Sequence, residues 1–271
     1  MNTTTSIEHE EERMVKGFEK VDMTGRVVVV TGGTGGMGKA TALLCAERGA
    51  SVVIADLNEQ LGNELAAEIA SAGGKAAFKR TDVSKESDVE AMVEFAVSTF
   101  GGLHAAFNNA GLETGQALLH EYPLAQWERG VAVNMTGVFL CVKHELAYML
   151  EHGGGSIVNT SSVSGVTGFP NMVEYVASKH GVVGITRAAA AEVSDKKIRV
   201  NAIVPGATET PMFLKLIDGN DEVRDFVASK HPINRVAKPS EMAEAAAWLL
   251  SDAASFVTGA CLSVDGGYSA L

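Results

Sequence analysis

Short β-branched runs alternate with longer stretches of helical periodicity along most of this chain, and this alternation restricts the possible folds more than any other feature. Parallel strands need long crossover connections, usually helices, so the pattern predicts βαβ units. Seven runs are expected to form strands, at 27–31, 51–56, 75–82, 103–109, 156–162, 198–205 and 261–267. Apolar spacings of three and four predict core-facing helices at 37–48, 58–72, 86–100, 128–151, 173–193 and 240–250. The predicted fold class is α/β: a Rossmann-type, doubly wound sheet of seven parallel strands with helices on both faces.

The 271 residues contain no interior linker rich in proline, serine or charge. Since α/β folds of about 250 residues often form one unit, we expect a single domain over residues 23–271. Residues 1–22 are polar and acidic, which predicts a tail or short helix outside the core. Residues 207–239 hold three of the six prolines and only a weak helical pattern. We interpret this long connection as a substrate-covering flap; the alternative is an irregular helical excursion that only packs.

The formal net charge of −11 argues against nucleic acid or an anionic membrane as the main partner, because neither supplies the counter-charge. No apolar stretch approaches the roughly 18 residues of a membrane span, and the N-terminus lacks the apolar run of a signal peptide. Three cysteines, far apart and outside any CxxC pair, argue against a disulfide framework or zinc site. We therefore expect a small-molecule substrate, no metal and a cytoplasmic location.

A glycine-rich segment, TGGTGGMG, follows the first predicted strand and leads directly into a helical pattern. Glycines let the backbone approach a pyrophosphate, and a helix N-terminus presents unpaired N–H donors to it. The alternative is a glycine-rich turn without a ligand, which the position between strand and helix disfavours. The cofactor contacts predicted in this segment are Gly32, Thr34, Gly36, Met37 and Gly38.

Asp56 ends the second predicted strand, eighteen residues after Gly38, where a carboxylate can accept hydrogen bonds from the ribose hydroxyls of NAD. An NADP phosphate would meet a like charge there at about 4 Å, which costs roughly 4 kcal/mol at an effective dielectric near 20. Leu57 follows in place of an arginine, and Gly35 supplies no base. NAD is therefore the predicted cofactor. The alternative role of Asp56 is a helix N-cap, which Asn58 can provide instead.

Two further strand ends carry candidate cofactor contacts, because doubly wound sheets bind ligands at the carboxyl ends of their strands. Asp82, followed by Val83, comes after the third strand and is expected near the adenine ring. Asn109, Ala110 and Gly111 come after the fourth strand and are expected on the adenosine side of the cleft. The alternative for either segment is an Asx turn without a ligand.

Tyr175 and Lys179 lie four residues apart in a predicted helix, so both side chains emerge on one face. A positive charge about 5 Å from a phenol, at an effective dielectric of about 20, favours the phenolate by roughly 3 kcal/mol. Lys179, aided by a positive nicotinamide ring, is thus expected to bring the pKa of Tyr175 close to neutral for general-base work. A YxxxK pair alone is more often a surface pair, but its position downstream of a cofactor loop favours catalysis.

Ser162 lies thirteen residues before Tyr175, at the end of the fifth predicted strand. A hydroxyl there can hydrogen-bond a substrate oxygen and stabilise developing charge. Ser161 and Ser164 are rivals, because strand alternation does not decide which serine faces the cleft. Asn134 completes the polar set, with a buried amide at a helix kink as the alternative.

As a set, TGGTGGMG, NNAG, Asn134, Ser162, YVASK and PGATET resemble the short-chain dehydrogenase/reductase family over about residues 24–271. The resemblance implies an NAD(P)-dependent enzyme for alcohols and ketones, and it selects Ser162 by the family's serine-to-tyrosine spacing. Tyr175 would exchange the hydroxyl proton while Ser162 holds the oxygen. Lys179 would bind the ribose and lower the pKa of the tyrosine, and Asn134 would hold a water of the proton relay.

The resemblance also implies nicotinamide contacts in the PGATET segment, at Pro205, Gly206, the backbone of Thr208 and the hydroxyl of Thr210. The C-terminal half is particularly similar to bacterial dehydrogenases of cyclic alcohols and diols, although such likeness carries fold and cofactor better than substrate. The family is usually tetrameric, and the terminal VDGGYSAL resembles its interface segment, so a homotetramer is implied.

Two alternatives to an NAD-dependent alcohol dehydrogenase stay open at this point. An NADPH-dependent ketone or 3-oxoacyl reductase is disfavoured by Asp56 and by the acidic surface. A catalytically silent NAD-binding protein is disfavoured by the complete set of Ser162, Tyr175 and Lys179.

Overall fold

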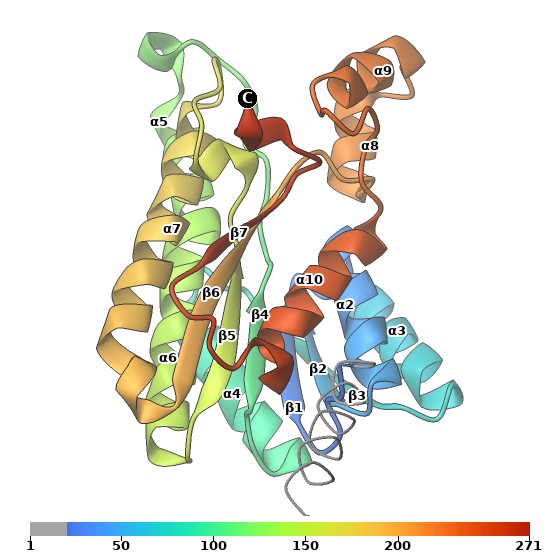
Figure 1. The fold of residues 1–271 in the computed structure, drawn as a ribbon, viewed down its shortest axis with the longest axis vertical. Coiled ribbons are helices and arrows are strands. Elements are labelled where there is room, and N and C mark those ends of the chain that lie inside the picture. Colours follow the sequence, from blue (N-terminus) through green and yellow to red (C-terminus); the bar gives the residue numbers. More distant parts are fainter. Residues whose placement is uncertain (1–20) are drawn as a thin grey trace, which may run out of the picture.

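The computed structural model describes residues 21–271, in which seven parallel strands form one sheet in the order β3-β2-β1-β4-β5-β6-β7 (Figure 1). The strands are β1 (Val27–Thr31), β2 (Ser51–Asp56), β3 (Lys75–Arg80), β4 (Ala105–Asn108), β5 (Gly155–Thr160), β6 (Ile198–Pro205) and β7 (Cys261–Val264). The strand order reverses between β1 and β4, which creates the switch point where such sheets bind ligands. The predicted tail lies, except for its last two residues, outside the described part of the chain.

The sheet is buried on both faces, and its central strands consist of apolar runs for that reason. All five residues of β1 are buried, and Val30 pairs with Ile54 of β2 on one side and Phe107 of β4 on the other. Successive side chains point to opposite faces, so Val29 joins one core layer and Val28 the other.

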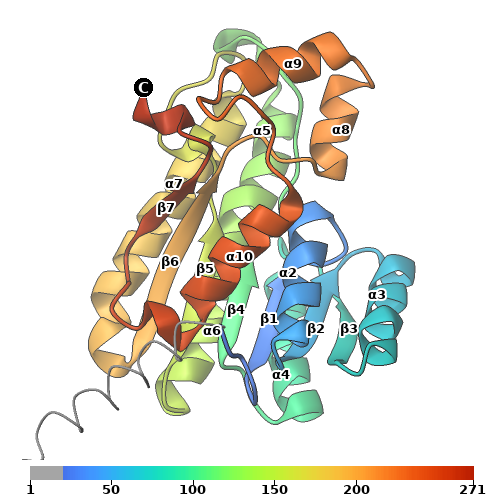
Figure 2. The ribbon, with the colours of Figure 1, turned by 45° about the vertical axis from the view of Figure 1, so that its right-hand side comes forward.

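Three helices cover each face of the sheet (Figures 1 and 2). One layer holds α4 (Glu86–Phe100), α6 (Gly137–Glu151) and α7 (Val173–Val193), whose buried residues form one core cluster with the strands. The other layer holds α2 (Gly36–Glu47), α3 (Glu59–Ser71) and α10 (Pro239–Leu250), which pack in the second cluster. The doubly wound parallel sheet predicted from the sequence is therefore confirmed.

Strands β3, β4, β5 and β7 have limits that differ from the predicted ranges, and two longer segments differ in their helices. The helix predicted at 128–151 is split into α5 (Leu124–Val131), a π-helical segment (Ala132–Thr136) and α6, because the helix begins directly after Pro123 and widens around a buried amide. The predicted flap contains two helices, α8 (Pro211–Ile217) and α9 (Asp221–Ser229), capped by the side chains of Thr210 and Asn220. These two helices lie together at one end of the molecule (Figure 2).

A polar network is buried within the core. Glu145 on α6 has no exposed surface, and Asn108 Nδ2 donates to Glu145 Oε2 at 2.9 Å and to Asn159 Oδ1 at 3.0 Å. Asn108 Oδ1 and Glu145 Oε1 are buried without a hydrogen-bond partner among the described residues. Burial raises the pKa of Glu145 to about 7. The raised pKa favours the protonated, neutral carboxyl in this buried site.

The network predicts a pH dependence of stability. The pKa of Glu145 rises from 4.5 to about 7 on folding, so the free energy of unfolding should fall as pH rises through this interval. Glu145→Gln supplies a donor and an acceptor at every pH, and it should reduce the loss of stability between pH 5 and pH 8. Urea denaturation of both proteins at these two pH values measures the difference. An equal loss of stability in wild type and variant would contradict the assignment.

Candidate active site

A cavity of about 620 Å³ lies beyond the carboxyl ends of β5 and β6. The start of α7 contributes Tyr175 to its wall, and the turn after β5 contributes Ser162. Met212 and Phe213 of α8 and Phe226 of α9 also line it, so the predicted flap segment forms one apolar side of the cavity. Whether this segment closes as a lid stays a prediction.

The glycine loop is built for close backbone approach. Gly32 has a φ of +61° and Gly36 a φ of +21°, a region that side chains other than glycine rarely adopt. A Cβ atom at Gly38 would collide with the carbonyl oxygen of Gly32. Helix α2 begins at Gly36, and no side chain caps it. Its first N–H groups therefore suit a pyrophosphate, as the sequence predicts.

Asn109 braces this loop from the neighbouring strand. Its Nδ2 donates to the carbonyl oxygens of Thr31 at 3.2 Å and of Gly32 at 3.3 Å, and Thr31 Oγ1 accepts from the backbone of Asn109 and Ala110. Gly111 lies nearby, and a Cβ atom there would approach Asn134 Oδ1 to 3.2 Å. The NNAG segment thus links the glycine loop to Asn134, one of the predicted catalytic residues.

Asp56 stands at the end of β2 with its carboxylate turned to the loop. Oδ2 accepts from the backbone N–H of Thr34 at 3.1 Å, and Oδ1 accepts from that of Asn58 at 3.1 Å. Asn58 caps α3 through its own side chain, so Asp56 is not the N-cap. Leu57 is 56% exposed beside it. The carboxylate, the loop and this open edge fit the adenosine ribose of a nicotinamide dinucleotide.

The two predicted adenine contacts, Asp82 and Val83, each have partners within the protein. Asp82 Oδ1 accepts from the backbone and the hydroxyl of Ser84 at 3.1 and 2.6 Å, which is an Asx turn. These hydrogen bonds, with Lys85, hold the pKa of Asp82 below its usual value against the effect of burial. Val83 is buried in the core, where it packs on Gly137. Their adenine contacts stay a prediction.

The hydroxyls of two of the three serines after β5 have different partners. Ser161 Oγ donates to the carbonyl oxygen of Lys179 at 2.9 Å, so this hydroxyl is held by the helix backbone. Ser162 Oγ accepts from the backbone N–H of Ser164 at 3.1 Å, and its hydroxyl is close enough to the Tyr175 side chain to lower the pKa of the tyrosine. The geometry therefore brings Ser162 and Tyr175 together.

Lys179 is buried one helical turn after Tyr175. Its Nζ donates to the carbonyl oxygen of Thr160 at 2.8 Å and lies 5.5 Å from the centre of the Tyr175 ring. Burial lowers the pKa of Lys179 to about 8, although the Glu174 carboxylate opposes this effect. The predicted juxtaposition of ammonium and phenol is present.

The pKa predicted for Tyr175 includes the charge of a bound nicotinamide and stays a prediction, because the protein groups alone give a different value. Burial raises the pKa of Tyr175 to about 12, the Ser162 hydrogen bond lowers it, and the carboxylates of Glu113 and Glu174 raise it further. The pKa predicted from the sequence includes the charge of Lys179 but not the cost of desolvating the phenolate. The protein groups alone therefore keep this tyrosine protonated.

Asn134 lies in the π-helical segment and is completely buried. Its Oδ1 accepts from Leu112 N at 2.8 Å, and its Nδ2 donates to Leu112 O at 2.9 Å and to Glu174 Oε1 at 3.2 Å. Both amide hydrogens are used, so only acceptor positions of this side chain can hold a water. The wider turn of the π-helix places the amide between two other segments.

Glu174 is a residue that the sequence reasoning missed. Its buried carboxylate accepts from Asn134, from Ser178 Oγ at 2.8 Å and from Thr114 Oγ1 at 2.5 Å. It therefore joins the π-helical segment, α7 and the loop after β4. The sequence shows an acidic residue directly before Tyr175, but it does not show that this residue is buried. A buried carboxylate requires hydrogen-bond partners of this kind.

The predicted nicotinamide contacts Pro205, Gly206, Thr208 and Thr210 all line the cavity. Thr208 Oγ1 donates to Gly206 O at 3.0 Å, and Thr210 Oγ1 accepts from Phe213 N at 3.2 Å as the N-cap of α8. Thr210 also packs on Gly36, where an added Cβ would lie 2.5 Å from its methyl carbon. The start of α8 thus closes over the glycine loop. Met37 lines the cavity at the same place.

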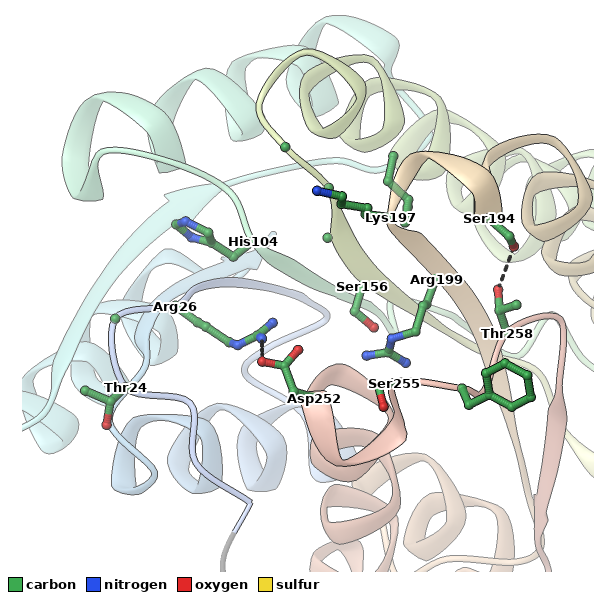
Figure 3. Close-up of a pocket in the computed structure, with 16 residues that line it drawn as sticks. Thr24, Arg26, His104, Ser156, Ser194, Lys197, Arg199, Asp252, Ser255 and Thr258 are labelled. Carbon is green, nitrogen blue, oxygen red and sulfur yellow. Dashed lines mark hydrogen bonds and ion pairs between the residues drawn. The ribbon is translucent and has the colours of Figure 1, made fainter. Parts of the chain in front are cut away.

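A second cavity, of about 750 Å³, lies at the opposite end of the sheet (Figure 3). Arg26 and His104, which precede β1 and β4, line it, and an ion pair of 2.5 Å joins Arg26 to Asp252. Arg199 donates to backbone carbonyls, including Ser251 O at 2.7 Å. None of the predicted catalytic or cofactor residues lines this cavity.

Residues 23–269 match the family model described as enoyl-(acyl carrier protein) reductase. The chain is 48% identical to the 2,5-dichloro-2,5-cyclohexadiene-1,4-diol dehydrogenase of Sphingobium indicum, over 92% of this chain and 99% of the relative. The chain belongs to the short-chain dehydrogenase/reductase family. It is also 44% identical to the cyclohexanol dehydrogenase of an Acinetobacter species, over 90% of this chain and 95% of the relative. The crystal structure of levodione reductase aligns with a TM-score of 0.88 and 38% identity, over 91% of this chain and 98% of that one.

As a short-chain dehydrogenase/reductase, the protein binds a nicotinamide cofactor and interconverts secondary alcohols and ketones. Within residues 21–271, no helix is long and apolar enough to cross a membrane. The same residues contain no cluster of three His, Cys, Asp or Glu side chains placed to hold a metal ion.

The hydrogen bonds that Glu174 accepts from Asn134, Ser178 and Thr114 are called the Glu174 clamp. This clamp predicts a positioning effect on catalysis. Glu174→Gln keeps one acceptor but turns an amide toward donors, so it should lower kcat by roughly ten-fold or more, as expected when a buried charged hydrogen bond is lost. The control is Ser178→Ala, which removes a hydrogen bond made only within α7. Steady-state kinetics and melting temperatures of both variants provide the test. Equal kcat values in the two variants would contradict the clamp.

Proposed function

We propose that this protein is an NAD-dependent dehydrogenase that interconverts a cyclic or otherwise hydrophobic secondary alcohol and its ketone. The observation that carries the proposal is that Ser162 and Tyr175 line one apolar cavity while the buried Lys179 ammonium lies 5.5 Å from the centre of the Tyr175 ring. The glycine loop and Asp56 stand at the adjoining strand ends. Two aligned relatives are named for cyclic alcohols or diols, which supports the cyclic substrate.

The chain's residues would divide the work around the reacting carbon. The nicotinamide ring, when bound, accepts or returns the hydride. Ser162 Oγ holds the substrate oxygen, and Tyr175 takes or returns its hydroxyl proton. Lys179 would bind the ribose hydroxyls with the donor hydrogens that Thr160 leaves free, and its charge favours the ionised phenol. Asn134 would hold a relay water through an acceptor oxygen.

The desolvation of Tyr175 means that a bound cofactor or substrate must stabilise the phenolate. With the pKa of Tyr175 near 12, proton removal needs further positive charge. A protonated Lys179 and an oxidised nicotinamide are the positive groups expected beside the phenol. Alcohol oxidation should therefore become faster as pH rises, because the phenolate is the base.

The quaternary structure and the cellular location of the protein are part of the same proposal. The C-terminal segment resembles the interface segment of tetrameric relatives, so a homotetramer is proposed. Cys45, Cys141 and Cys261 are free thiols, as expected in a reducing compartment such as the cytoplasm.

Asp56 predicts the cofactor preference. The wild type should use NAD with a kcat/KM about three decades above that for NADP, because of the like charge. Asp56→Asn removes the charge but keeps an oxygen acceptor for Thr34 N–H, so the ratio should shrink by ten-fold or more. Initial rates with both cofactors on one secondary alcohol measure it. A wild-type preference for NADP would defeat this assignment of Asp56.

Tyr175→Phe tests the assigned base. The variant keeps the ring and loses only the hydroxyl, so NAD binding should remain nearly intact while turnover falls by several orders of magnitude. Fluorescence titration of NAD and absorbance of NADH measure the two properties separately. Unchanged turnover would show that another group transfers the proton.

A further inference from the structure

One carboxylate interrupts the apolar wall of the catalytic cavity. Glu113 lines the same cavity as Tyr175, together with Phe169, Met172 and Phe226. Among residues 21–271, Glu113 has no hydrogen bond and no ion pair, unlike Glu174 beside the tyrosine. Glu113 is partly exposed, so water can solvate its carboxylate until a ligand group in the cavity replaces that water. Glu113 is thus an acceptor that the protein leaves open toward the substrate.

The backbone around Glu113 is fixed to the catalytic residues. On one side, Leu112 exchanges two hydrogen bonds with the Asn134 amide, at 2.8 and 2.9 Å. On the other side, Thr114 donates to the Glu174 carboxylate at 2.5 Å. Both neighbours of Glu113 are therefore anchored while its own side chain is free. This arrangement resembles a recognition group held at a defined distance from the reacting centre.

The negative charge of Glu113 disfavours the ionised form of Tyr175, so proton transfer does not explain a carboxylate at this position. Its carboxylate raises the pKa of Tyr175, beyond the effect of burial. Lys230 is the cavity's other exposed charge, and its Nζ lies 4.5 Å from the centre of the Phe226 ring, without an ion pair to Glu113. A substrate ammonium would have to share the cavity with that lysine. A neutral hydroxyl meets no such penalty and can donate to the carboxylate.

We propose that Glu113 determines specificity by accepting a hydrogen bond from a second hydroxyl of the substrate, so that cyclic diols are the preferred substrates. The inference rests on the proposed alcohol dehydrogenase function and names the group that selects within it. The first hydroxyl reacts at Ser162 and Tyr175, and the second is held by Glu113. A hydroxy acid of the same ring size places its carboxylate against Glu113 and is disfavoured.

The test compares substrates within each variant, so that effects on Tyr175 cancel. The full chain with NAD is assayed on cyclohexanol, on the 1,2-, 1,3- and 1,4-cyclohexanediols and on 4-hydroxycyclohexanecarboxylate. The variants are Glu113→Leu, Glu113→Gln and the control Glu121→Gln, a nearby exposed carboxylate that does not line the cavity. The quantity compared is each kcat/KM relative to that of cyclohexanol.

The proposal predicts opposite shifts for the two kinds of substrate. A charged hydrogen bond corresponds to roughly ten- to hundred-fold in kcat/KM. The best diol should lose that factor relative to cyclohexanol in Glu113→Leu and a smaller factor in Glu113→Gln. The hydroxy acid should gain in both, and Glu121→Gln should match the wild type.

Two outcomes distinguish a failure of the proposed role of Glu113 from a failure of the proposed substrate class. Turnover of cyclohexanol with the same diol ratio in wild type, Glu113→Leu and Glu113→Gln would overturn the role of Glu113 and leave the dehydrogenase proposal standing. No turnover of any of these alcohols by the wild type would contradict the proposed cyclic alcohol substrate itself.

Discussion

The hydrogen bond from Lys179 to the carbonyl oxygen of Thr160 is the contact on which the site depends. It ties the first half of α7 to the carboxyl end of β5 through a buried ammonium. Ser162 follows Thr160 by two residues, and Tyr175 precedes Lys179 by one helical turn. This contact thus joins the segment that carries Ser162 to the helix that carries Tyr175 and Lys179. The parallel sheet supplies the rest, because its strand ends open on the same side.

Burial is the second physical constraint, and it works against the charged forms of the reacting groups. It lowers the pKa of Lys179 and raises that of Tyr175, so the protein alone favours neutral side chains. Glu174 partly offsets this for the lysine and also clamps Asn134. A nicotinamide cofactor, with its positive ring, supplies charge at the place where the chain lacks it. The account therefore couples proton transfer to an occupied cofactor site.

Much of the site could be predicted from the sequence because its signals are local. The glycine loop, Asp56 and the Tyr175–Lys179 pair are set by strand ends and helix periodicity, and the structure brings them to the same side of the sheet. The choice of Ser162 rested on a family spacing, and the bond of Ser161 to the helix backbone explains it physically. The predicted limits of β1, β2 and β6 match the structure, whereas β3, β4, β5 and β7 end earlier than predicted.

The features that were missed depend on contacts between distant segments. Glu174 and Asn134 are forty residues apart, and no periodicity reports their hydrogen bond. The π-helical turn that carries Asn134 has no periodicity signal either, so the sequence predicted one uninterrupted helix instead. Glu113 has the same origin, since only the folded chain places it in the cavity. The pKa of Tyr175 in the protein alone was not predicted, because charge spacing is visible in a sequence while desolvation is not.

The most direct test of the central claim is a crystal structure of the protein with NAD. The account predicts that the Lys179 ammonium keeps its contact with the carbonyl of Thr160 and also reaches the nicotinamide ribose, with the Tyr175 hydroxyl facing the reactive edge of the ring. A nicotinamide bound away from this cavity, or a Tyr175 hydroxyl turned from the ring with Lys179 unable to reach the ribose, would contradict it.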